Sequence, residues 1–222
     1  MSPTTYGTFH VVRKNLYIIG ARGFGRETAV WLPTWPGFAD QYVIKGFLDD
    51  KADALDGFGG YPPIVSSVED FRPGERDVFI CALGAVEWRR KYIGIVLSKG
   101  GVFDTFVYPL AYVRAREIGA GTFIVGAVEI SPDVSIGDHV LCHPNVVIGH
   151  DVKIGDYAVL ENGVFCGGYS EIGPGATLHT RSTILPHKTI GANATVGACS
   201  CVARNVKKAS VVFGVPAVRI DE

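Results

Sequence analysis

The chain has 222 residues, of which 47% are hydrophobic and 19% charged, so it can bury the core of one large or two small domains and is not intrinsically disordered. Its 21 basic and 22 acidic residues give a net charge of −1, which provides no overall positive field for nucleic acid, and its apolar runs are too short for membrane insertion. Five cysteines without a CxxC pair, and an N-terminus without the apolar core of a signal peptide, indicate a reduced, cytoplasmic protein with buried thiols.

The first hundred residues alternate between strand and helix patterns. In chain order we expect a strand at 16–19, a glycine-rich turn and helix over 20–32, strands at 42–48 and 77–84, a helix at 87–99 and a strand at 102–107. The capping-box sequence at 66–69 predicts one further short helix. This alternation is typical of a small parallel sheet covered by helices, and we expect a Rossmann-like domain at 15–110 after an N-terminal tail at 1–14 that contains His10.

From Ile118 the pattern changes to a repeat of six residues. Cutting the chain every six residues from 118 to 207 gives fifteen hexads without an insertion, and the first residue of every hexad is apolar. The fifth residue is Ala, Ser, Thr or Val in fourteen of the fifteen hexads, with Lys188 as the exception. The pair Ile-Gly also recurs every eighteen residues, at positions 118, 136, 154, 172 and 190.

This repeat predicts a parallel β-helix. A hexad with one large and one small inward residue makes one flat side and one turn, three hexads close a triangle, and stacked triangles pair at the strand spacing of about 4.8 Å. Glycine occupies the second position of eight hexads, where we expect it to serve turns that need an uncommon backbone conformation. We therefore predict a β-helix of about five coils within 111–222, because the strands of a β-sandwich would show a period of two.

Several short motifs connect this repeat to the N-terminal domain. They are Gly20-Ala-Arg-Gly-Phe-Gly25, Phe47-Leu-Asp-Asp50, Ala82-Leu-Gly84 followed by Arg89, the stretch 148–155, and Gly214-Val-Pro-Ala217. With these motifs the chain resembles, over about residues 15–220, the hexapeptide-repeat sugar O-/N-acetyltransferase family, which includes bacterial sialic acid O-acetyltransferases and the UDP-4-amino-sugar N-acetyltransferase of the bacillosamine pathway. The resemblance implies a left-handed β-helix, acetyl-CoA as co-substrate, a nucleotide sugar as acceptor, and a homotrimer with active sites between subunits.

His150 is the candidate general base. It occupies the third position of its hexad, at a predicted corner of the β-helix, and Asp151 follows it. The resemblance places the family's base at this residue, and neutral imidazole is a suitable acceptor for the proton that an attacking amine or hydroxyl must lose. Asp151 would fix the tautomer of the ring. The alternative is a solvated histidine beside an ordinary turn aspartate.

One position departs from the family pattern. The relative that acts on a UDP-4-amino sugar carries a second histidine nine residues after the base, and here that position is Val159. Stabilisation of the oxyanion is therefore expected from backbone amides around Gly167 and Gly168. The resemblance also implies that acetyl-CoA lies in a groove that passes Thr180 and Ala198.

The resemblance places a nucleotide-sugar site in the N-terminal domain, lined by Arg22, Gly23, Phe24, Asp49, Asp50 and Gly84. A strand-to-helix turn with three glycines brings backbone N–H groups and a helix N-terminus toward an anion such as a diphosphate. Ordinary turn chemistry is the alternative. The spacing differs from the dinucleotide motif GxGxxG, which argues against NAD.

Three residues of the β-helix, His143, Glu161 and His179, fall eighteen residues apart in one predicted column. The γ-class carbonic anhydrases bind zinc on this fold through three histidines shared across a trimer, but the spacing here does not match theirs. An outward-facing column of polar residues explains the pattern better, and we expect no metal site.

The sequence is thus most consistent with an acetyl-CoA-dependent N-acetyltransferase that acts on a nucleotide-linked amino sugar for a bacterial surface glycan. O-acetylation of a sugar of the sialic acid type is the nearest alternative. A zinc lyase of the γ-carbonic anhydrase type and a non-catalytic binding module are the alternatives from other classes. The sugar, the nucleotide and the length of the acyl chain stay open.

Overall fold

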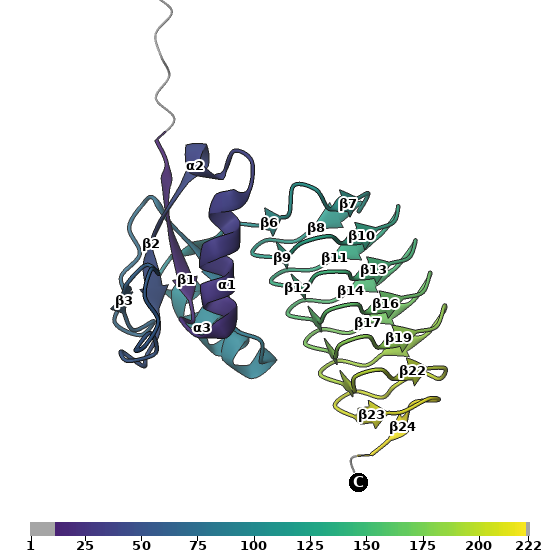
Figure 1. Ribbon diagram of the computed structural model, residues 1–222. Coiled ribbons are helices and arrows are strands. Elements are labelled where there is room, and N and C mark those ends of the chain that lie inside the picture. Colours follow the sequence, from purple (N-terminus) through teal and green to yellow (C-terminus); the bar gives the residue numbers. More distant parts are fainter. Residues whose placement is uncertain (1–11, 221–222) are drawn as a thin grey trace, which may run out of the picture.

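The computed structural model describes residues 12–220 and consists of an α/β domain beside a triangular β-solenoid (Figure 1). Residues 1–11 and 221–222, which include His10 and most of the predicted tail, lie outside the described residues. The predicted fold class, a parallel α/β domain followed by a β-helix of hexapeptide repeats, is confirmed.

The N-terminal sheet has five parallel strands in the order β3-β2-β1-β4-β5. The strands are β1 (Lys14–Ile19), β2 (Tyr42–Leu48), β3 (Ile64–Ser66), β4 (Asp77–Cys81) and β5 (Val102–Phe103). The helices are α1 (Gly23–Trp31), η1 (Leu32–Thr34), α2 (Phe38–Gln41) and α3 (Val86–Ser98). The apolar residues of β1 and β4 are buried on both sides of the sheet, as expected for a parallel sheet covered by other layers.

Two expectations for this domain are wrong. The capping-box sequence begins in strand β3 and continues into a turn, where the Ser67 hydroxyl accepts a hydrogen bond from the Asp70 backbone amide at 3.0 Å. The predicted strand at 102–107 is two strands, because β5 pairs with β4 while β6 (Phe106–Val107) pairs with β9 of the solenoid. Asp104, between them, accepts hydrogen bonds from Lys14 and Tyr42.

The solenoid has three parallel sheets that form the sides of a prism. The sheet that faces the N-terminal domain, here called the domain-facing sheet, contains β6, β9 (Phe123–Ile124), β12 (Leu141–Cys142), β15 (Val159–Leu160), β18 (Thr177–Leu178), β21 (Thr195–Val196), β23 (Val211–Phe213) and the antiparallel β24 (Val218–Arg219). The β7 sheet contains β7 (Tyr112–Val113), β10 (Glu129–Ile130), β13 (Val147–Ile148), β16 (Phe165–Cys166), β19 (Thr183–Ile184) and β22 (Cys201–Val202). The β8 sheet contains β8 (Glu117–Ile118), β11 (Ser135–Ile136), β14 (Lys153–Ile154), β17 (Glu171–Ile172) and β20 (Thr189–Ile190).

The inside of the prism follows the hexad pattern. First-position residues pair directly with those one coil away, so that Ile118, Ile136, Ile154, Ile172 and Ile190 form one ladder of the β8 sheet. The small fifth-position residues, such as Val134 and Ala176, are fully buried. The first coil begins at β6, so the expected boundary between 110 and 111 falls inside it.

The expected role of the second-position glycines is wrong, because the uncommon backbone conformation lies two residues later. Positive φ occurs at the fourth position, mostly in residues other than glycine, for example Asp151 at 60° and Tyr169 at 58°. The second-position glycines leave room for the next coil, since a Cβ added to Gly155 would lie 2.6 Å from the backbone nitrogen of Pro174. Glycine is required there by close stacking of coils rather than by turn geometry.

The N-terminal domain packs directly onto the domain-facing sheet. Phe123, Leu141 and Val159 point outward from that sheet and belong to the same buried cluster as Leu16 and Ile18 of β1. Val159 is only 1% exposed, so the position that carries a second histidine in the relative is filled here by a packing residue of the domain interface.

A buried arginine joins the two domains. Arg89 of α3 is 1% exposed and donates hydrogen bonds to the carbonyls of Cys81 (3.0 Å) and Leu83 (3.1 Å), just after β4, and to that of His139 (2.6 Å) in the solenoid. The guanidinium therefore fixes the carboxyl end of β4 against a corner of the β-helix.

Of the five cysteines, Cys81, Cys142 and Cys166 are buried as expected, whereas Cys199 is exposed because it occupies a corner of the prism. Among the described residues, none of the helices has the length and apolar character needed to cross a membrane.

Candidate active site

His150 lies on the edge between the β7 and β8 sheets, which we call the His150 edge. Its Nδ1 lies 2.8 Å from Oδ2 of Asp151, and both side chains are largely exposed. The ring of Tyr169, one coil away, meets the imidazole edge to face at 5.0 Å. A histidine whose Nδ1–H is held by a carboxylate presents Nε2 as a free proton acceptor, which is the geometry that a general base needs.

Gly168 lies directly against this imidazole. A Cβ added to Gly168 would be 2.9 Å from Nε2 of His150, so a larger residue would displace the ring. The Gly168 N–H makes no hydrogen bond within residues 12–220, whereas the Gly167 N–H donates to the Ile184 carbonyl at 2.8 Å. Of the two amides, only that of Gly168 is free to stabilise an oxyanion.

A second candidate site is a cavity of about 340 Å³ at the carboxyl ends of β1 and β2. Arg22, Asp49 and Asp50 line it, together with Leu83, Trp88 and Tyr92. This is where ligands bind in open parallel sheets, because strand ends and helix N-termini meet there. Arg22 is also the N-cap residue of α1, where no side chain caps the helix.

The two aspartates of this cavity have different roles. Asp49 accepts hydrogen bonds from the backbone amides of Ala21 (2.8 Å) and Lys51 (2.9 Å), so it holds the glycine-rich turn beside the end of β2. Asp50 accepts a hydrogen bond from the Tyr92 hydroxyl. Burial opposes ionisation of Asp50, but this hydrogen bond and others hold its pKa below the ordinary value, so Asp50 is the ionised acceptor of the cavity.

The sequence motifs described above do not include the aromatic residues of the cavity. Trp88 and Tyr92 lie one helical turn apart on α3, with their rings stacked at 6.0 Å, and Trp88 is 48% exposed. Aromatic residues at positions i and i+4, at the start of a helix that follows a parallel strand, were the signal available in the sequence.

The other predicted nucleotide-binding residues are dispersed. Gly23 opens α1 and lines a separate shallow depression with Arg26 and Tyr61. Phe24 packs against the β-helix, with its ring 4.9 Å from that of His143. Gly84 is exposed just after β4, next to Leu83 of the cavity.

The residues predicted to bind acetyl-CoA lie on two different edges of the prism. Gly167 and Gly168 belong to the His150 edge. Thr180 and Ala198 belong to the edge between the domain-facing and β7 sheets, which we call the His143 edge. The whole β7 sheet separates the two pairs within one chain.

The predicted column of His143, Glu161 and His179 also lies on the His143 edge. Oε1 of Glu161 is 3.0 Å from Nδ1 of His179, and Oε2 accepts hydrogen bonds from the Thr180 amide (3.0 Å) and hydroxyl (3.1 Å). Two members of the column, Glu161 and His179, thus form a second histidine–carboxylate pair. Among residues 12–220, no three His, Cys, Asp or Glu side chains are arranged as a metal site.

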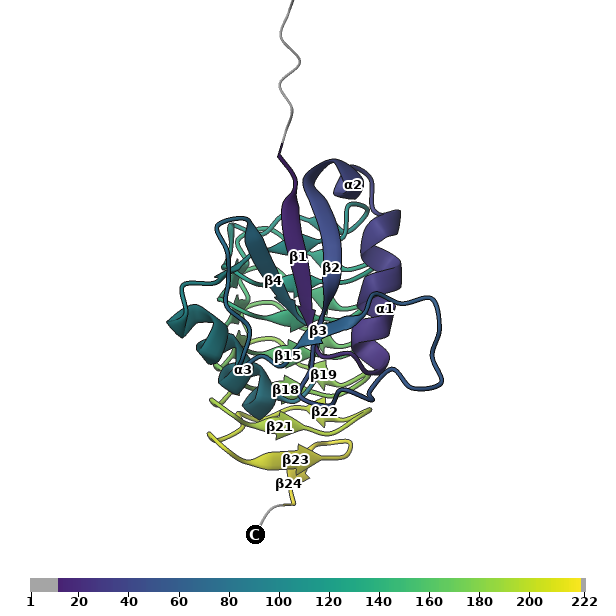
Figure 2. The same ribbon diagram turned by 90° about the vertical axis from the view of Figure 1, so that its left-hand side faces the viewer.

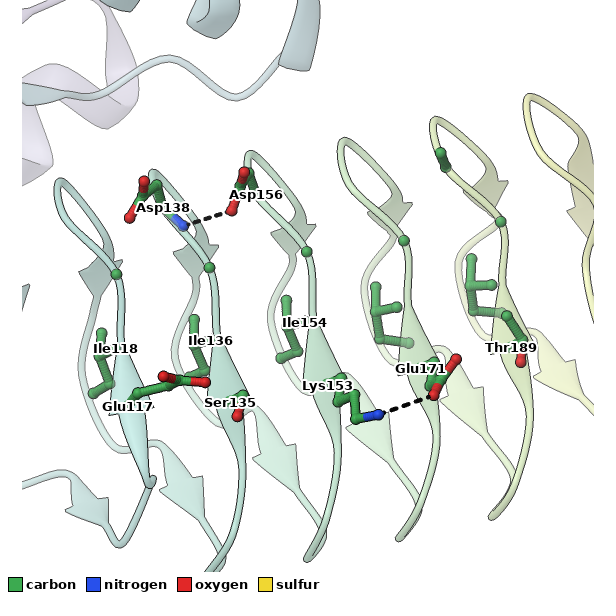
Figure 3. Close-up of a pocket in the computed structure, with 18 residues that line it drawn as sticks. Glu117, Ile118, Ser135, Ile136, Asp138, Lys153, Ile154, Asp156, Glu171 and Thr189 are labelled. Atoms are coloured by element: carbon green, nitrogen blue, oxygen red, sulfur yellow. Dashed lines mark hydrogen bonds and ion pairs between the residues drawn. The ribbon is translucent and has the colours of Figure 1, made fainter.

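The outer face of the β8 sheet, the third side of the prism, carries contacts between coils rather than a histidine–carboxylate pair. A broad depression of about 900 Å³ follows the β8 sheet, where isoleucines point inward and polar residues outward (Figure 3). Lys153 and Glu171 form an exposed ion pair between adjacent coils at 3.5 Å, and Asp156 accepts a hydrogen bond from the Asp138 amide at 2.9 Å. These contacts tie one coil to the next.

Comparisons with known proteins agree with this architecture. Residues 15–95 match the family model described as the PglD N-terminal domain, and residues 133–168 match the bacterial transferase hexapeptide model (six repeats). The chain thus resembles hexapeptide-repeat transferases over residues 133–168 and proteins with a PglD-type N-terminal domain over residues 15–95. The resemblance to this family and the prediction of a transferase enzyme are thereby confirmed.

Several solved structures are similar to this chain over nearly its whole length. They include the acetyltransferase domain of PglB from Neisseria gonorrhoeae (TM-score 0.80, 22% identity, 94% of this chain and 100% of that one). A perosamine N-acetyltransferase variant from Caulobacter crescentus, in complex with CoA and GDP-perosamine, has a TM-score of 0.81 and 23% identity over 94% of this chain and 97% of that one. WeeI from Acinetobacter baumannii has a TM-score of 0.75 and 25% identity over 92% and 99%. No curated protein matches the sequence.

Proposed function

We propose that this transferase moves the acetyl group of acetyl-CoA to the amine of a nucleotide-linked amino sugar in the synthesis of a bacterial surface glycan. The observation that carries the proposal is the His150–Asp151 pair at 2.8 Å, exposed on an edge of the β-helix beside the free amide of Gly168. The similar folds that bind CoA and GDP-perosamine support both substrates.

The geometry supports a direct transfer. The acceptor nitrogen attacks the thioester carbonyl carbon while Nε2 of His150 takes its proton, and Asp151 stabilises the resulting imidazolium. The Gly168 amide donates to the oxyanion of the tetrahedral intermediate. The C–S bond then breaks, and CoA leaves as the thiol after taking the proton from the His150 imidazolium.

The N-terminal cavity supports a nucleotide as the other half of the acceptor. The uncapped N-terminus of α1 beside Arg22 provides backbone N–H groups for a diphosphate. Trp88 offers an exposed ring for a base or sugar, and Asp50 offers an ionised oxygen to N–H or O–H donors of the ligand.

This cavity and His150 lie on different sides of one chain. The N-terminal domain covers the domain-facing sheet, whereas the His150 edge is formed by the other two sheets (Figure 1). One subunit must therefore present its nucleotide cavity to His150 of another. The same argument applies to acetyl-CoA, since Gly167 and Gly168 can share a groove with Thr180 and Ala198 only when the two edges come from different subunits.

A homotrimer is the assembly that this requirement favours, because a cyclic trimer brings the His150 edge of each subunit to the His143 edge of the next. The outer face of the β7 sheet, between these edges, exposes Phe165 (41%) and Tyr112 (55%). Light scattering should give three times the 23.8 kDa mass of the chain at micromolar concentration. A stable monomer under those conditions would contradict the shared active site.

Acetyl transfer is tested with a panel of UDP-, GDP-, CMP- and dTDP-linked 4-amino sugars and their hydroxyl counterparts. Thermal shifts identify the nucleotide, and release of free CoA thiol measures the reaction. We expect acetylation of at least one amino sugar, and we expect it to persist after exhaustive EDTA treatment. Acetylation of hydroxyl sugars alone would favour the O-acetyltransferase, and activity that depends on added zinc would favour the lyase-type metal site.

A further inference from the structure

The second histidine–carboxylate pair, His179 with Glu161, is placed for chemistry that the proposed mechanism does not use. Both carboxylate oxygens of Glu161 are engaged, Oε1 with His179 and Oε2 with Thr180, so it acts as a fixed anion. The side chains of His179 and Glu161 remain 40% and 32% exposed. With Nδ1 held by the carboxylate, Nε2 of His179 is open to a ligand in the same way as Nε2 of His150.

A protonated amine acceptor must lose two protons during the reaction, and one base accepts only one of them. A sugar amine with a pKa of about 8 is mostly R–NH₃⁺ at neutral pH. It loses one proton to become a nucleophile and a second proton as the N–C bond forms. A hydroxyl acceptor loses only one.

We propose that His179, oriented by Glu161, accepts the first proton of the amine acceptor, and that His150 of the neighbouring subunit accepts the second. In the first step R–NH₃⁺ gives a proton to Nε2 of His179, which leaves R–NH₂ and an imidazolium beside the Glu161 carboxylate. In the second step R–NH₂ attacks the thioester as described above. This inference rests on the proposed function and specifies an amine as the acceptor group.

The placement of the pair supports this role. Thr180, which binds Glu161, lies on the edge that meets the His150 edge of a neighbour in the proposed trimer. The carboxyl ends of β1, β2 and β4 lie at the level of β15 and β18, the strands that precede Glu161 and His179 (Figure 2). The N-terminal cavity, which lies at these strand ends, is therefore at the same height along the prism as the pair (Figure 2).

A cleft below the N-terminal domain opens on the same sheet, at the edge where β18 and β21 begin. It has a volume of about 430 Å³ and is lined by Val86 and Arg90 of α3 and by Thr177 and Thr195 of the coils. Thr177 and His179 flank the inward-facing Leu178 of β18, so both point outward from the domain-facing sheet. The cleft and the pair thus lie on the same side of the prism, the cleft at the start of β18 and the pair after its end.

The Glu161 carboxylate supplies the negative charge of the pair. Burial opposes ionisation of Glu161, but its contacts with His179 and Thr180 hold its pKa below the ordinary value. His143, one coil away, has its pKa lowered by burial and by the charge of Arg89 and raised by Glu161, with a net lowering that keeps it neutral. Of the helices packed on this sheet, α1 places the ring of Phe24 beside His143. Helix α3 contributes the charged side chains of Arg89, Glu87 and Arg90, of which Glu87 and Arg90 line the cleft.

The test compares His179→Asn and Glu161→Gln with the wild-type trimer, using the amino sugar of the panel that the wild-type protein acetylates fastest. At pH 7 about a tenth of an amine of pKa 8 is already unprotonated, and at pH 9 most of it is. His179→Asn should therefore lower kcat/KM roughly tenfold at pH 7 and less than about twofold at pH 9. Glu161→Gln should show a smaller loss with the same recovery at high pH.

The matched control is Glu171→Gln, which removes the carboxylate of another ion pair between coils, with Lys153 on the β8 sheet, and should leave the pH profile unchanged. A loss in His179→Asn that is equal at pH 7 and pH 9, or no loss, would overturn this inference while acetylation by the wild-type protein upholds the proposed function. If the wild-type protein acetylates no amino sugar, both are overturned.

Discussion

Replacing His150 with alanine should lower kcat by roughly 10²–10⁴-fold and leave the affinity for acetyl-CoA nearly unchanged. The imidazole lies directly against Gly168, 2.9 Å from the position of an added Cβ, and its Nε2 is the proton acceptor of the proposed mechanism. Asp151→Asn should cost less, because Asp151 orients the ring and stabilises its charge without taking the proton. Steady-state rates of CoA release, with acetyl-CoA affinity measured by calorimetry, separate the two effects.

His187→Ala is the matched control for this change. His187 lies one coil beyond Tyr169 on the same edge, where its ring stacks on Tyr169 at 4.9 Å. Loss of that ring should keep kcat within about threefold of the wild type, because His187 does not contact the Asp151 carboxylate that activates a base. A His150→Ala variant that kept more than a tenth of the wild-type kcat would show that the base is another residue.

Replacing Arg89 with alanine should reduce the free energy of unfolding by about 3 kcal/mol or more. The change removes three charge-assisted hydrogen bonds and leaves the carbonyls of Cys81, Leu83 and His139 without their buried donor. Because Leu83 lines the N-terminal cavity, the variant should also bind the nucleotide more weakly. Urea denaturation measures the first effect and nucleotide-dependent thermal shifts the second.

Arg90→Ala controls for loss of a cation at the same place in α3. Arg90 is exposed, with a hydrogen bond to Asn193 at 2.7 Å and its guanidinium 5.5 Å from the Tyr157 ring. Its removal should cost about 1 kcal/mol or less, since solvent screens exposed polar contacts. Equal destabilisation in the two variants would refute the role of Arg89 as the buried connection between the domains.

The β-helix could be predicted from the sequence almost completely. Every first-position residue from Ile118 to Val202 is apolar, and direct pairing of Ile118 with Ile136 and Ile136 with Ile154 follows from the period of eighteen residues. Each hexad stacks on hexads of the same pattern in the adjacent coils. The repeat therefore contains both residues of each contact between coils. His150 with Asp151 was also within reach, because adjacent residues at a corner need no tertiary information to pair.

Contacts between residues that are distant in the sequence and outside the repeat pattern could not be predicted in this way. The sequence by itself indicated that Asp49 and Asp50 end a strand, but only the folded loop assigned Asp49 to two backbone amides and Asp50 to Tyr92. The same holds for the role of Gly155, which depends on the backbone of Pro174 in the next coil.

The period of eighteen residues is enough to predict the coil register, and with it the column that contains Glu161 and His179. The packing of the N-terminal domain on the domain-facing sheet, which buries Val159 and leaves His150 on the opposite edge, is visible only in the folded chain. Domain packing depends on the fit of whole surfaces formed by residues distant in sequence, such as Leu16 and Leu141, whereas the hexad pattern needs only one residue type at each position of a short repeat.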